Sequence, residues 1–327
     1  MTAAEILRAI PGLSVLVVGD ICLDRWCTYD PATAEPSSET GIPRIGVVQT
    51  EVTPGAGGTV ANNLSDLGAG SVAVAGVIGD DGFGIELRRA LEARGVETSY
   101  LVVEPALQTF TYTKLLNRGT QLEDQPRIDF INTQPMPERA EREIMSNLEL
   151  AVSRFDVVLV SDQAETEAGG VVTLRVREWL SGIALAFEHK VVFVDSRKRI
   201  ELFRHAVLKP NRVEAESACR RLFGVVDYSR LRRETAAPLL MVTHGDRGVL
   251  LVDQAGAEWV RTRPVEKPVD ICGAGDSFSA GAALALAAGA SAREAAAFGN
   301  LVASITISKK GTGTASPDEV LAAQEQI

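Results

Sequence analysis

The segment DICGAGDSFSAG (270–281) places three small residues between two aspartates, directly before an alanine-rich run. The run predicts a helix that begins near Asp276, so the backbone N–H groups of Gly273, Ala274 and Gly275 would point outward at its positive end and bind an anion. A carboxylate beside an anion site is repulsive unless it serves a protonated partner such as a substrate hydroxyl. Asp276 could accept that proton while the amides stabilise a transferred phosphoryl group.

The alternative reading of this segment is purely structural, with Asp276 as a helix N-cap and the glycines as a tight turn. A strand-like run, VEKPVD, leads into Asp270. The chain contains no G-x-x-x-x-G-K-[ST], so phosphoryl transfer here would not use a Walker P-loop. The segment alone leaves both readings open.

Continuous apolar runs alternate with helical patterns along much of the chain, as expected for strands buried on both faces. The candidate strands are 14–20, 71–79, 156–162, 190–195, 206–210 and 238–243, and the clearest helices between them are 57–67 and 83–94. This repetition predicts an α/β fold with a doubly wound, mostly parallel sheet, in a single domain spanning 1–327. Several strands end in Asp or Thr. Ligands bind beyond such strand ends in open sheets, although these residues could simply cap the next helices.

Two segments do not fit this repetition. IPRIGVVQT (42–50) and TFTYTKLLN (109–117) show the partial alternation of strands, but they are too far apart for a simple hairpin. We expect them to form a small separate β-sheet that acts as a lid, inserted at about 41–52 and 108–131.

Composition excludes some partners. The net charge is −10, which disfavours nucleic acid because its phosphates would be repelled, but a few local cations could still bind an anionic metabolite. The longest apolar region, 280–308, contains Arg293, Glu294 and Asn300, which predicts a helical hairpin rather than a membrane span. The N-terminus predicts a short amphipathic helix rather than a signal peptide, and the four cysteines lack zinc-ligand spacing. We therefore expect a cytoplasmic protein with no membrane partner.

Six motifs occur in an order that resembles the ribokinase/PfkB family of carbohydrate kinases. One of them, DICGAGD (270–276), is similar to the family's D-T-x-G-A-G-D. The segment KKGTGTASP (309–317), together with the early GDICLDR, is similar to bacterial heptose-7-phosphate kinases. The other motifs are GDICLDRW (19–26), PGAGGTVANNLSDLGA (54–69), GVIGDDGFG (76–84), KPNRVE (209–214) and THGDRG (243–248).

The resemblance implies a ribokinase-like fold and an ATP- and Mg²⁺-dependent kinase, with Asp276 as catalytic base and the amides of Gly273, Ala274 and Gly275 as anion hole. Glu214 would hold Mg²⁺ mainly through water. Asp270 is the candidate oxygen donor for a monovalent cation such as K⁺. The residues implied to contact ATP are Asn211, Thr243, Gly245, Gly248, Asn300 and Gly311. The residues implied to contact the sugar are Asp24, Gly55, Gly57, Gly58, Asn62 and Lys114.

Each of these roles has a structural alternative. Asn211 and Glu214 could be an ordinary solvated helix start, and Asn300 could bond to a loop. Asp24 could form a salt bridge with Arg25 or another cation. Asp195, Arg197 and Lys198 follow a strand near the expected nucleotide side, where the two cations could touch phosphate or be solvated.

The sequence also departs from the family pattern. Thr59 stands where the family usually has Asn, so either the sugar is read differently or Asn62 or Asn63 takes over. The loop 161–170 contains Gln163 and Glu165 but no lysine, whereas the heptose-phosphate kinases carry a Tyr and a Lys there. This weakens the case for the same phosphorylated sugar.

Other cations and a thiol leave further questions open. Lys114, Arg118 and Arg127 could bind a substrate phosphate or form a solvated strand face. Cys272 replaces the usual Thr and could confer sensitivity to thiol reagents.

The function predicted is transfer of the γ-phosphoryl group of ATP to a hydroxyl of a sugar or sugar phosphate, by a homodimer paired through its lid. One alternative is a nucleoside kinase, for which Phe110 and Tyr112 could stack a base. The other is a sugar- or nucleotide-binding regulator without catalysis. The chain shows no nucleotidyltransferase domain of the kind that often accompanies heptose kinases, so the pathway stays open.

Overall fold

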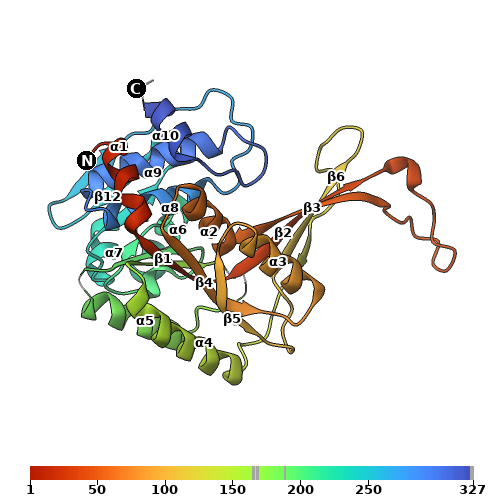
Figure 1. Cartoon of the computed structure of the whole chain (residues 1–327), viewed down its shortest axis with the longest axis horizontal. Helices are drawn as coiled ribbons and strands as arrows, with labels where there is room; N and C mark the ends of the chain where they lie inside the picture. The colour runs from red at the N-terminus through yellow and green to blue at the C-terminus, as the bar shows by residue number, and fades with distance from the viewer. Residues whose placement is uncertain (164–165, 167–168, 188, 325–327) are drawn as a thin grey trace.

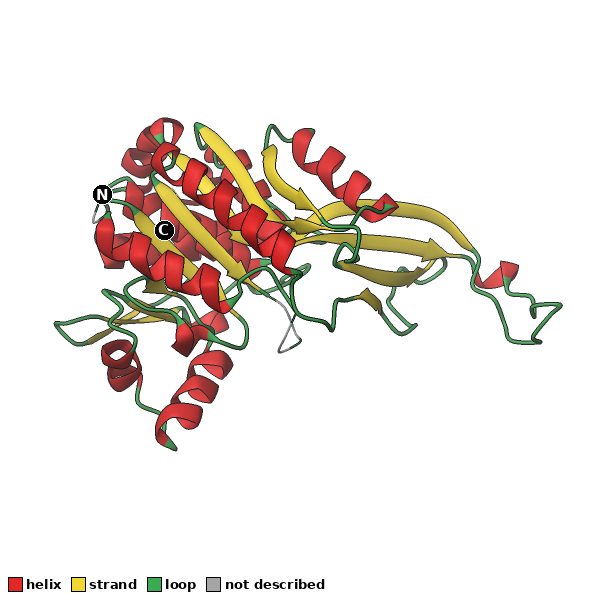
Figure 2. Ribbon diagram, turned by 90° about the horizontal axis from the view of Figure 1, so that it is seen from below, coloured by secondary structure: helices red, strands yellow, loops and turns green. Residues whose placement is uncertain are grey.

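The computed structural model describes residues 1–163, 166, 169–187 and 189–324. They form a large sheet with helices on both faces and a smaller sheet that projects from one end (Figures 1 and 2). No helix in these ranges combines the length and the apolar character that crossing a membrane requires.

The large sheet has the strand order β13-β12-β11-β10-β9-β8-β1-β4-β5. Its pairs are parallel except at one edge, where β11, β12 and β13 are antiparallel. This confirms the predicted doubly wound, mostly parallel sheet. The strands are β1 (Ser14–Gly19), β4 (Ser71–Ile78), β5 (Glu97–Val103), β8 (Val157–Asp162), β9 (Val191–Ser196), β10 (Val207–Leu208), β11 (Leu240–Thr243), β12 (Val249–Val252) and β13 (Ala257–Val260).

Two hydrophobic cores lie on opposite faces of this sheet. Side chains alternate across a strand, so Val15 and Val17 of β1 join one core while Leu16 and Val18 join the other. The first core is covered by α1 (Ala3–Ala9), α2 (Gly57–Asp66), α3 (Gly82–Glu92), α8 (Ala274–Ala287), α9 (Ala292–Thr306) and α10 (Pro317–Gln324). The second is covered by α4 (Glu138–Ala151), α5 (Leu174–Ala186), α6 (Arg212–Phe223) and α7 (Tyr228–Glu234).

The smaller sheet has the order β3-β2-β6-β7. β2 is antiparallel to β3 and parallel to β6, and β7 is antiparallel to β6. At the far end of β2 the chain forms an arm, residues 30–46, that extends beyond the sheet (Figure 1). The strands are β2 (Ile21–Tyr29), β3 (Val47–Ala56), β6 (Thr111–Asn117) and β7 (Ile128–Phe130).

One motif spans two sheets, and one expectation about strands was wrong. The segment GDICLDRW (19–26) begins at the last residue of β1 and continues into β2 of the small sheet. The run VEKPVD is a loop rather than a strand. The N–H groups of Val269 and Asp270 both donate to the Ile307 carbonyl at the end of α9, so this backbone is tied to a helix end and not to a neighbouring strand.

Candidate active site

The first turn of α8 carries the three small residues of the opening motif. The helix begins at Ala274, and its N-cap Gly273 has a left-handed backbone (φ 78°). A Cβ at residue 273 would lie 3.3 Å from the Cγ2 atoms of Thr312 and Thr59. First-turn N–H groups have no acceptor one turn earlier in the helix, although that of Ala274 donates to the Ile271 carbonyl at 3.3 Å. The turn therefore presents backbone donors to an approaching anion, with Ala274 already engaged in part.

Asp276 lies on the same turn, half-buried, in the wall of a cavity of about 370 Å³. Burial raises the pKa of Asp276 to about 7; the carboxylates of Asp195 and Asp24 act in the same direction, and Lys209 and Arg197 oppose them. A carboxyl group with a pKa near 7 exchanges its proton close to neutral pH, which suits a general base.

The cavity gathers most of the predicted nucleotide-contacting residues around Asp276. They come from the start of α6, the loop after β11, the middle of α9 and the first turn of α8. The predicted residues that line it are Asn211, Glu214, Thr243, Gly245, Gly248, Gly273, Ala274, Gly275, Asp276 and Asn300.

Asn211 and Glu214 cap α6 reciprocally. The Glu214 N–H donates to Asn211 Oδ1 at 3.0 Å, and the Asn211 N–H donates to Glu214 Oε2 at 2.7 Å. Burial raises the pKa of Glu214 to about 7, aided by the Asp195 charge and opposed by Lys209 and by the bond from Asn211. Glu214 is thus a half-buried carboxyl group beside other acids, not a solvated one.

Two predicted nucleotide residues are placed differently from the rest. Asn300 lines the cavity, but its Nδ2 also donates to the Val260 carbonyl at 3.4 Å, which is the loop bond considered as its alternative role. Gly311 does not line this cavity. It lies in a second cavity of about 810 Å³ beside the small sheet, where a Cβ at residue 311 would be 3.7 Å from the Trp26 ring.

Asp24 is carried by β2 and faces the Gly-rich segment. A Cβ at Gly55 would lie 2.7 Å from the Asp24 carboxyl group, so a side chain at residue 55 would displace this carboxyl group. Burial raises the pKa of Asp24 to about 6, while Lys114 and Arg127 lower it and Asp129 raises it. The charge of Asp24 raises the pKa of Asp276, so the two carboxyl groups share one region.

Asp24 does not pair with Arg25, because successive strand residues point to opposite faces. Arg25 Nε lies 3.9 Å from Glu86 Oε2, and its guanidinium lies 4.8 Å from the centre of the Phe83 ring. The interpretation of Asp24 as the partner of Arg25 was therefore wrong.

Gly57, Gly58 and Asn62 belong to the start of α2. A Cβ at Gly57 would lie 2.7 Å from Ile21, and one at Gly58 would lie 2.5 Å from Pro54, so these glycines allow the helix to pack closely. Asn62 is 1% exposed and lines neither of the two cavities. Their contacts with a sugar stay predictions.

The hydroxyl of Thr59 is also used within the protein. Thr59 Oγ1 donates to the Pro54 carbonyl at 3.2 Å, and Asn63 Nδ2 donates to the Thr59 carbonyl at 2.9 Å. Asn63 is fully buried. Thr59, the departure from the family pattern, therefore bonds to the segment before α2, and Asn63 bonds within α2.

Asp270 closes the loop before α8 onto the C-terminal segment. One carboxylate oxygen accepts from the Cys272 N–H at 2.9 Å and the other from the Gly311 N–H at 3.2 Å. Burial, first of all, raises the pKa of the neighbouring Cys272 thiol. These bonds give Asp270 a structural role, and its binding of a cation stays a prediction.

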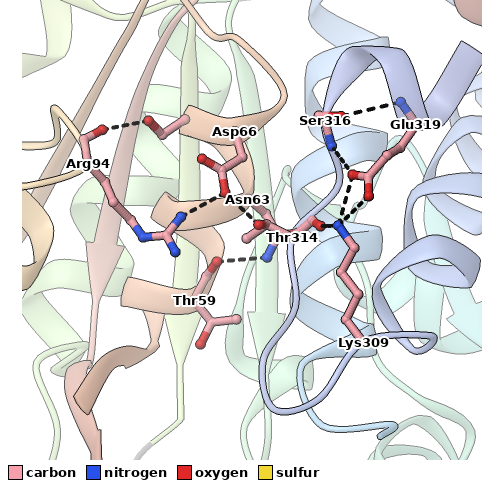
Figure 3. Close-up of polar contacts among 9 residues, drawn as sticks. Thr59, Asn63, Asp66, Arg94, Lys309, Thr314, Ser316 and Glu319 are labelled. Atoms are coloured by element: carbon pink, nitrogen blue, oxygen red, sulfur yellow. Dashed lines mark hydrogen bonds and ion pairs between the residues drawn. The ribbon is translucent and has the colours of Figure 1, made fainter. Parts of the chain in front are cut away.

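The C-terminal segment 309–319 is also tied to α2 (Figure 3). Thr314 Oγ1 donates to Asp66 at 2.5 Å, and Asp66 also accepts from Arg94 at 2.7 Å. Lys309 Nζ donates to the Thr314 carbonyl at 2.6 Å and to Glu319 at 2.8 Å. This network fixes the loop that carries Thr312 against Gly273.

The lid cations have partners within the lid. Arg118 pairs with Asp30 at 2.7 Å, and Arg127 pairs with Asp129 at 2.6 Å. Lys114 Nζ lies 5.9 Å from the centre of the Trp26 ring. Binding of a substrate phosphate by the two arginines would have to compete with these carboxylates.

The loop after β8 contributes Gln163 to the cavity of Asp276. Asp20 holds both ends of this loop, accepting from the N–H groups of Gln163 and Val171 at 2.8 Å each. Glu165, named above for the same loop, lies outside the described residues.

Comparison with known proteins identifies the family. Residues 14–319 match the model of the pfkB family carbohydrate kinases. The chain belongs to this family. Curated relatives include bifunctional protein HldE of Trichlorobacter lovleyi, 32% identical over 95% of this chain, and HldE of Bradyrhizobium diazoefficiens, 32% identical over 98%. The chain spans 62% and 66% of the lengths of these two proteins.

Solved structures show the same fold. A ribokinase from Thermotoga maritima superimposes with a TM-score of 0.71 at 22% identity, covering 96% of this chain and 99% of that one. Phosphofructokinase-2 from Escherichia coli gives a TM-score of 0.71 at 19% identity, covering 96% and 99%. The predicted ribokinase-like fold and the family assignment of this pfkB-family chain are both confirmed.

One charged residue of the cavity was missed by the sequence analysis. Lys209 is 3% exposed, lines the cavity and pairs with Asp195 at 2.5 Å. The available signal was a lysine directly after a buried strand, at the carboxyl end where ligands bind in open sheets.

Proposed function

We propose that this pfkB-family chain transfers the γ-phosphoryl group of ATP to a hydroxyl of a sugar or sugar phosphate. The observation that carries the proposal is the position of Asp276. It stands on the first turn of α8, in the cavity lined by Asn211 and Thr243, and it is coupled electrostatically to Asp24 of the lid. A base between a nucleotide pocket and a polar lid residue is the arrangement that phosphoryl transfer to a hydroxyl requires.

In the proposed mechanism, Asp276 takes the proton from the attacking hydroxyl group. The phosphoryl group passes in line across the first turn of α8, where the backbone N–H groups of Gly273–Gly275 stabilise its charge. Asp24 and the small sheet hold the sugar and exclude water, which prevents hydrolysis of ATP. Catalysis then depends mainly on positioning and electrostatics.

Mg²⁺ fits the donor set near Glu214. This carboxyl group lines the cavity, and burial beside Asp195 raises its pKa, so a cation would stabilise its charged form. No cluster of three metal-ligating side chains is found in the described part of the chain, and Mg²⁺ commonly keeps several waters and uses one carboxylate plus substrate phosphates. Glu214 would hold the ion through water, and the bound ion would neutralise phosphate charge.

The acceptor class is argued from the lid and from the relatives. The likeness to heptose-7-phosphate kinases and to HldE proteins supports a sugar or sugar phosphate. Phe110 is only 9% exposed, so it is not available to stack a nucleobase, and Tyr112 already carries the Arg127 guanidinium 5.0 Å from its ring centre. These two observations favour a sugar over a nucleoside.

A homodimer in the cytoplasm completes the proposal. β3 is an edge strand of the small sheet, and exposed apolar residues cluster on it and on the adjoining arm: Ile42, Ile45, Val47, Val48 and Val52. An uncovered edge with apolar side chains favours pairing with another chain. We propose that a second copy covers this edge.

The test is ATP consumption with Mg²⁺ against a panel of sugars, sugar phosphates and nucleosides. We expect turnover with one sugar class and a loss of about 10²–10⁴-fold in Asp276→Asn, the usual contribution of a general base. Turnover restricted to nucleosides would show that the acceptor is a nucleoside and not a sugar. ATP binding without turnover on any of them, or near-full activity in Asp276→Asn, would contradict the mechanism.

A further inference from the structure

Lys209 follows β10 and enters the protein interior rather than solvent. Its N–H donates to the Val194 carbonyl of β9 at 2.9 Å, and its ammonium pairs with Asp195 at 2.5 Å. Ser279 of α8 donates to the same Asp195 carboxyl group at 3.4 Å. Lysine is seldom buried without a partner, and here the strand end and the ion pair fix where the ammonium lies.

The ammonium of Lys209 lies against the first turn of α8. A Cβ at Gly275 would be 3.3 Å from Lys209 Nζ. Gly275 is one of the three residues whose amides form the proposed anion hole, and Lys209 lines the same cavity. The ammonium group of Lys209 and the backbone donors therefore lie side by side in the wall of the cavity.

The cavity is lined by several carboxyl groups, whose negative charges favour a cation beside them. Asp195, Glu214 and Asp276 line it, and Arg197 and Lys209 are the cations that line it among the described residues. Burial lowers the pKa of Lys209, but Asp195, Glu214 and Asp276 outweigh this effect and the pKa is raised, so the charge is retained. An ammonium has three donors, so pairing with Asp195 leaves capacity for a phosphate oxygen.

Stability alone is a weak reason for this ion pair. Replacing a buried pair by apolar residues is often neutral or stabilising, because both charges lose their hydration. A cation of this kind has a clearer use where a phosphoryl group must be neutralised.

We propose, resting on the proposed function, that Lys209 is a catalytic residue that contacts the γ-phosphoryl group of ATP and stays with it during transfer. Asp195 is the positioning residue that holds the ammonium under Gly275. Neither role belongs to the residues that the motifs singled out for catalysis.

The test separates the γ-phosphate from the rest of the nucleotide. Binding of ATP and of ADP, each with Mg²⁺ and without acceptor, is measured by calorimetry for the native protein and for Lys209→Met. The matched control is Lys267→Met, since Lys267 is exposed and lies in the loop before the motif. We expect Lys209→Met to weaken ATP binding about tenfold or more while ADP binding changes less than about twofold. We also expect kcat to fall about 10²–10³-fold, the effect of removing one oxyanion donor.

Lys209→Met leaves Asp195 buried and unpaired, which could unfold the protein. The double variant Lys209→Met/Asp195→Asn removes both charges, and its melting curve reports whether the fold is restored. A folded double variant that has lost the preference for ATP supports the proposal. A double variant with the native ATP-to-ADP ratio, equal weakening of both nucleotides, or loss of fold in both variants overturns it.

The two proposals fail in different ways. If the native protein turns over a sugar and Lys209→Met keeps the native kcat, the role of Lys209 is wrong and the kinase function stands. If no acceptor is turned over but Lys209→Met still loses its preference for ATP, the kinase function is wrong and the phosphate contact stands.

Discussion

Asp276 combines partial burial with nearby carboxylates, and this sets the pH range of the proposed reaction. Its pKa is raised to about 7, so the group is protonated below that pH and free to act as a base above it. We expect kcat/KM to rise with pH through about 7 and to level off above it. A pH–rate profile on the accepted sugar measures this, and a flat profile from pH 5.5 to 8.5 would contradict it.

The same shift predicts a change in stability. The pKa of Asp276 is about 7 in the folded protein and near 3.8 in the unfolded chain, so between these values the folded state binds more protons. Its contribution to stability is therefore present below about pH 4 and is lost as the pH rises through 7. Asp276→Asn does not titrate, so we expect its melting temperature to exceed the native value by more at pH 8 than at pH 5. Equal differences at both pH values would argue against the raised pKa.

A substitution at Asp24 tests acceptor binding separately from nucleotide binding. Asp24 lies in the lid against Gly55 and is not one of the residues that line the nucleotide cavity. We expect Asp24→Asn to raise KM for the sugar about tenfold or more, since a charged hydrogen bond to a hydroxyl is lost, and to leave ATP affinity nearly unchanged. Steady-state kinetics in both substrates measure this. A larger effect on the KM for ATP than on the KM for the sugar would contradict the proposed role of Asp24 in sugar binding.

At the scale of single residues, the sequence was informative where a motif dictates a backbone conformation. The tight turn before Asp276 could be predicted, because the three small residues there allow a backbone conformation that larger side chains would disfavour. Lys209 could not be assigned, because its partner Asp195 is on another strand and only the sheet brings them together. The position of Gly311 could not be predicted for the same reason, since the lid residue that it faces, Trp26, is distant in the sequence, and its contact with ATP stays a prediction.

The start of α8 is the element on which the proposed anion hole depends. Gly273 has φ 78°, and a Cβ there would meet Thr312 and Thr59 at 3.3 Å. We expect Gly273→Ala to lower the free energy of unfolding by about 1–2 kcal/mol, the cost of a left-handed backbone for a residue with a side chain, and to lower kcat as well.

Gly289 supplies a matched control for this substitution. It has φ 91° just after α8, and a Cβ there would meet nothing within 4 Å. Gly289→Ala should therefore show a similar loss in chemical denaturation but a normal kcat. If both variants lose activity equally, the effect belongs to the stability of α8 and not to the geometry of the turn.

Elements with a strong local pattern were predicted well, and those defined by distant partners were not. The apolar runs of β1, β8 and β9 were identified because both faces are buried. β2 was not assigned to a sheet from the sequence, since a strand that continues directly from β1 is distinguished from it only by its neighbours, β3 and β6. The run before Asp270 has strand-like residues but no strand beside it.

At the scale of the whole molecule, the two sheets differ in how far the rest of the chain covers them. The large sheet is covered by helices on both faces, whereas the small sheet projects from it with an exposed edge (Figure 2). The alternation of strands and helices made the first predictable. The arm 30–46 and the edge of β3 do not follow this alternation, and the expected strand 42–50 overlaps β3 only from Val47 onward.

The proposed dimer predicts where a single charge should break the assembly. Val47 on β3 is 45% exposed and stands beside the exposed Ile45 of the arm. Burying an aspartate in an apolar interface carries a large desolvation cost, so we expect Val47→Asp to convert a dimer into a monomer with little change in melting temperature. Light scattering after size exclusion measures the mass. The matched control is Leu150→Asp, because Leu150 is 70% exposed at the end of α4, a helix that packs on the large sheet. A native protein that is monomeric at micromolar concentration, or a mass that responds to Leu150→Asp instead, would place the interface elsewhere.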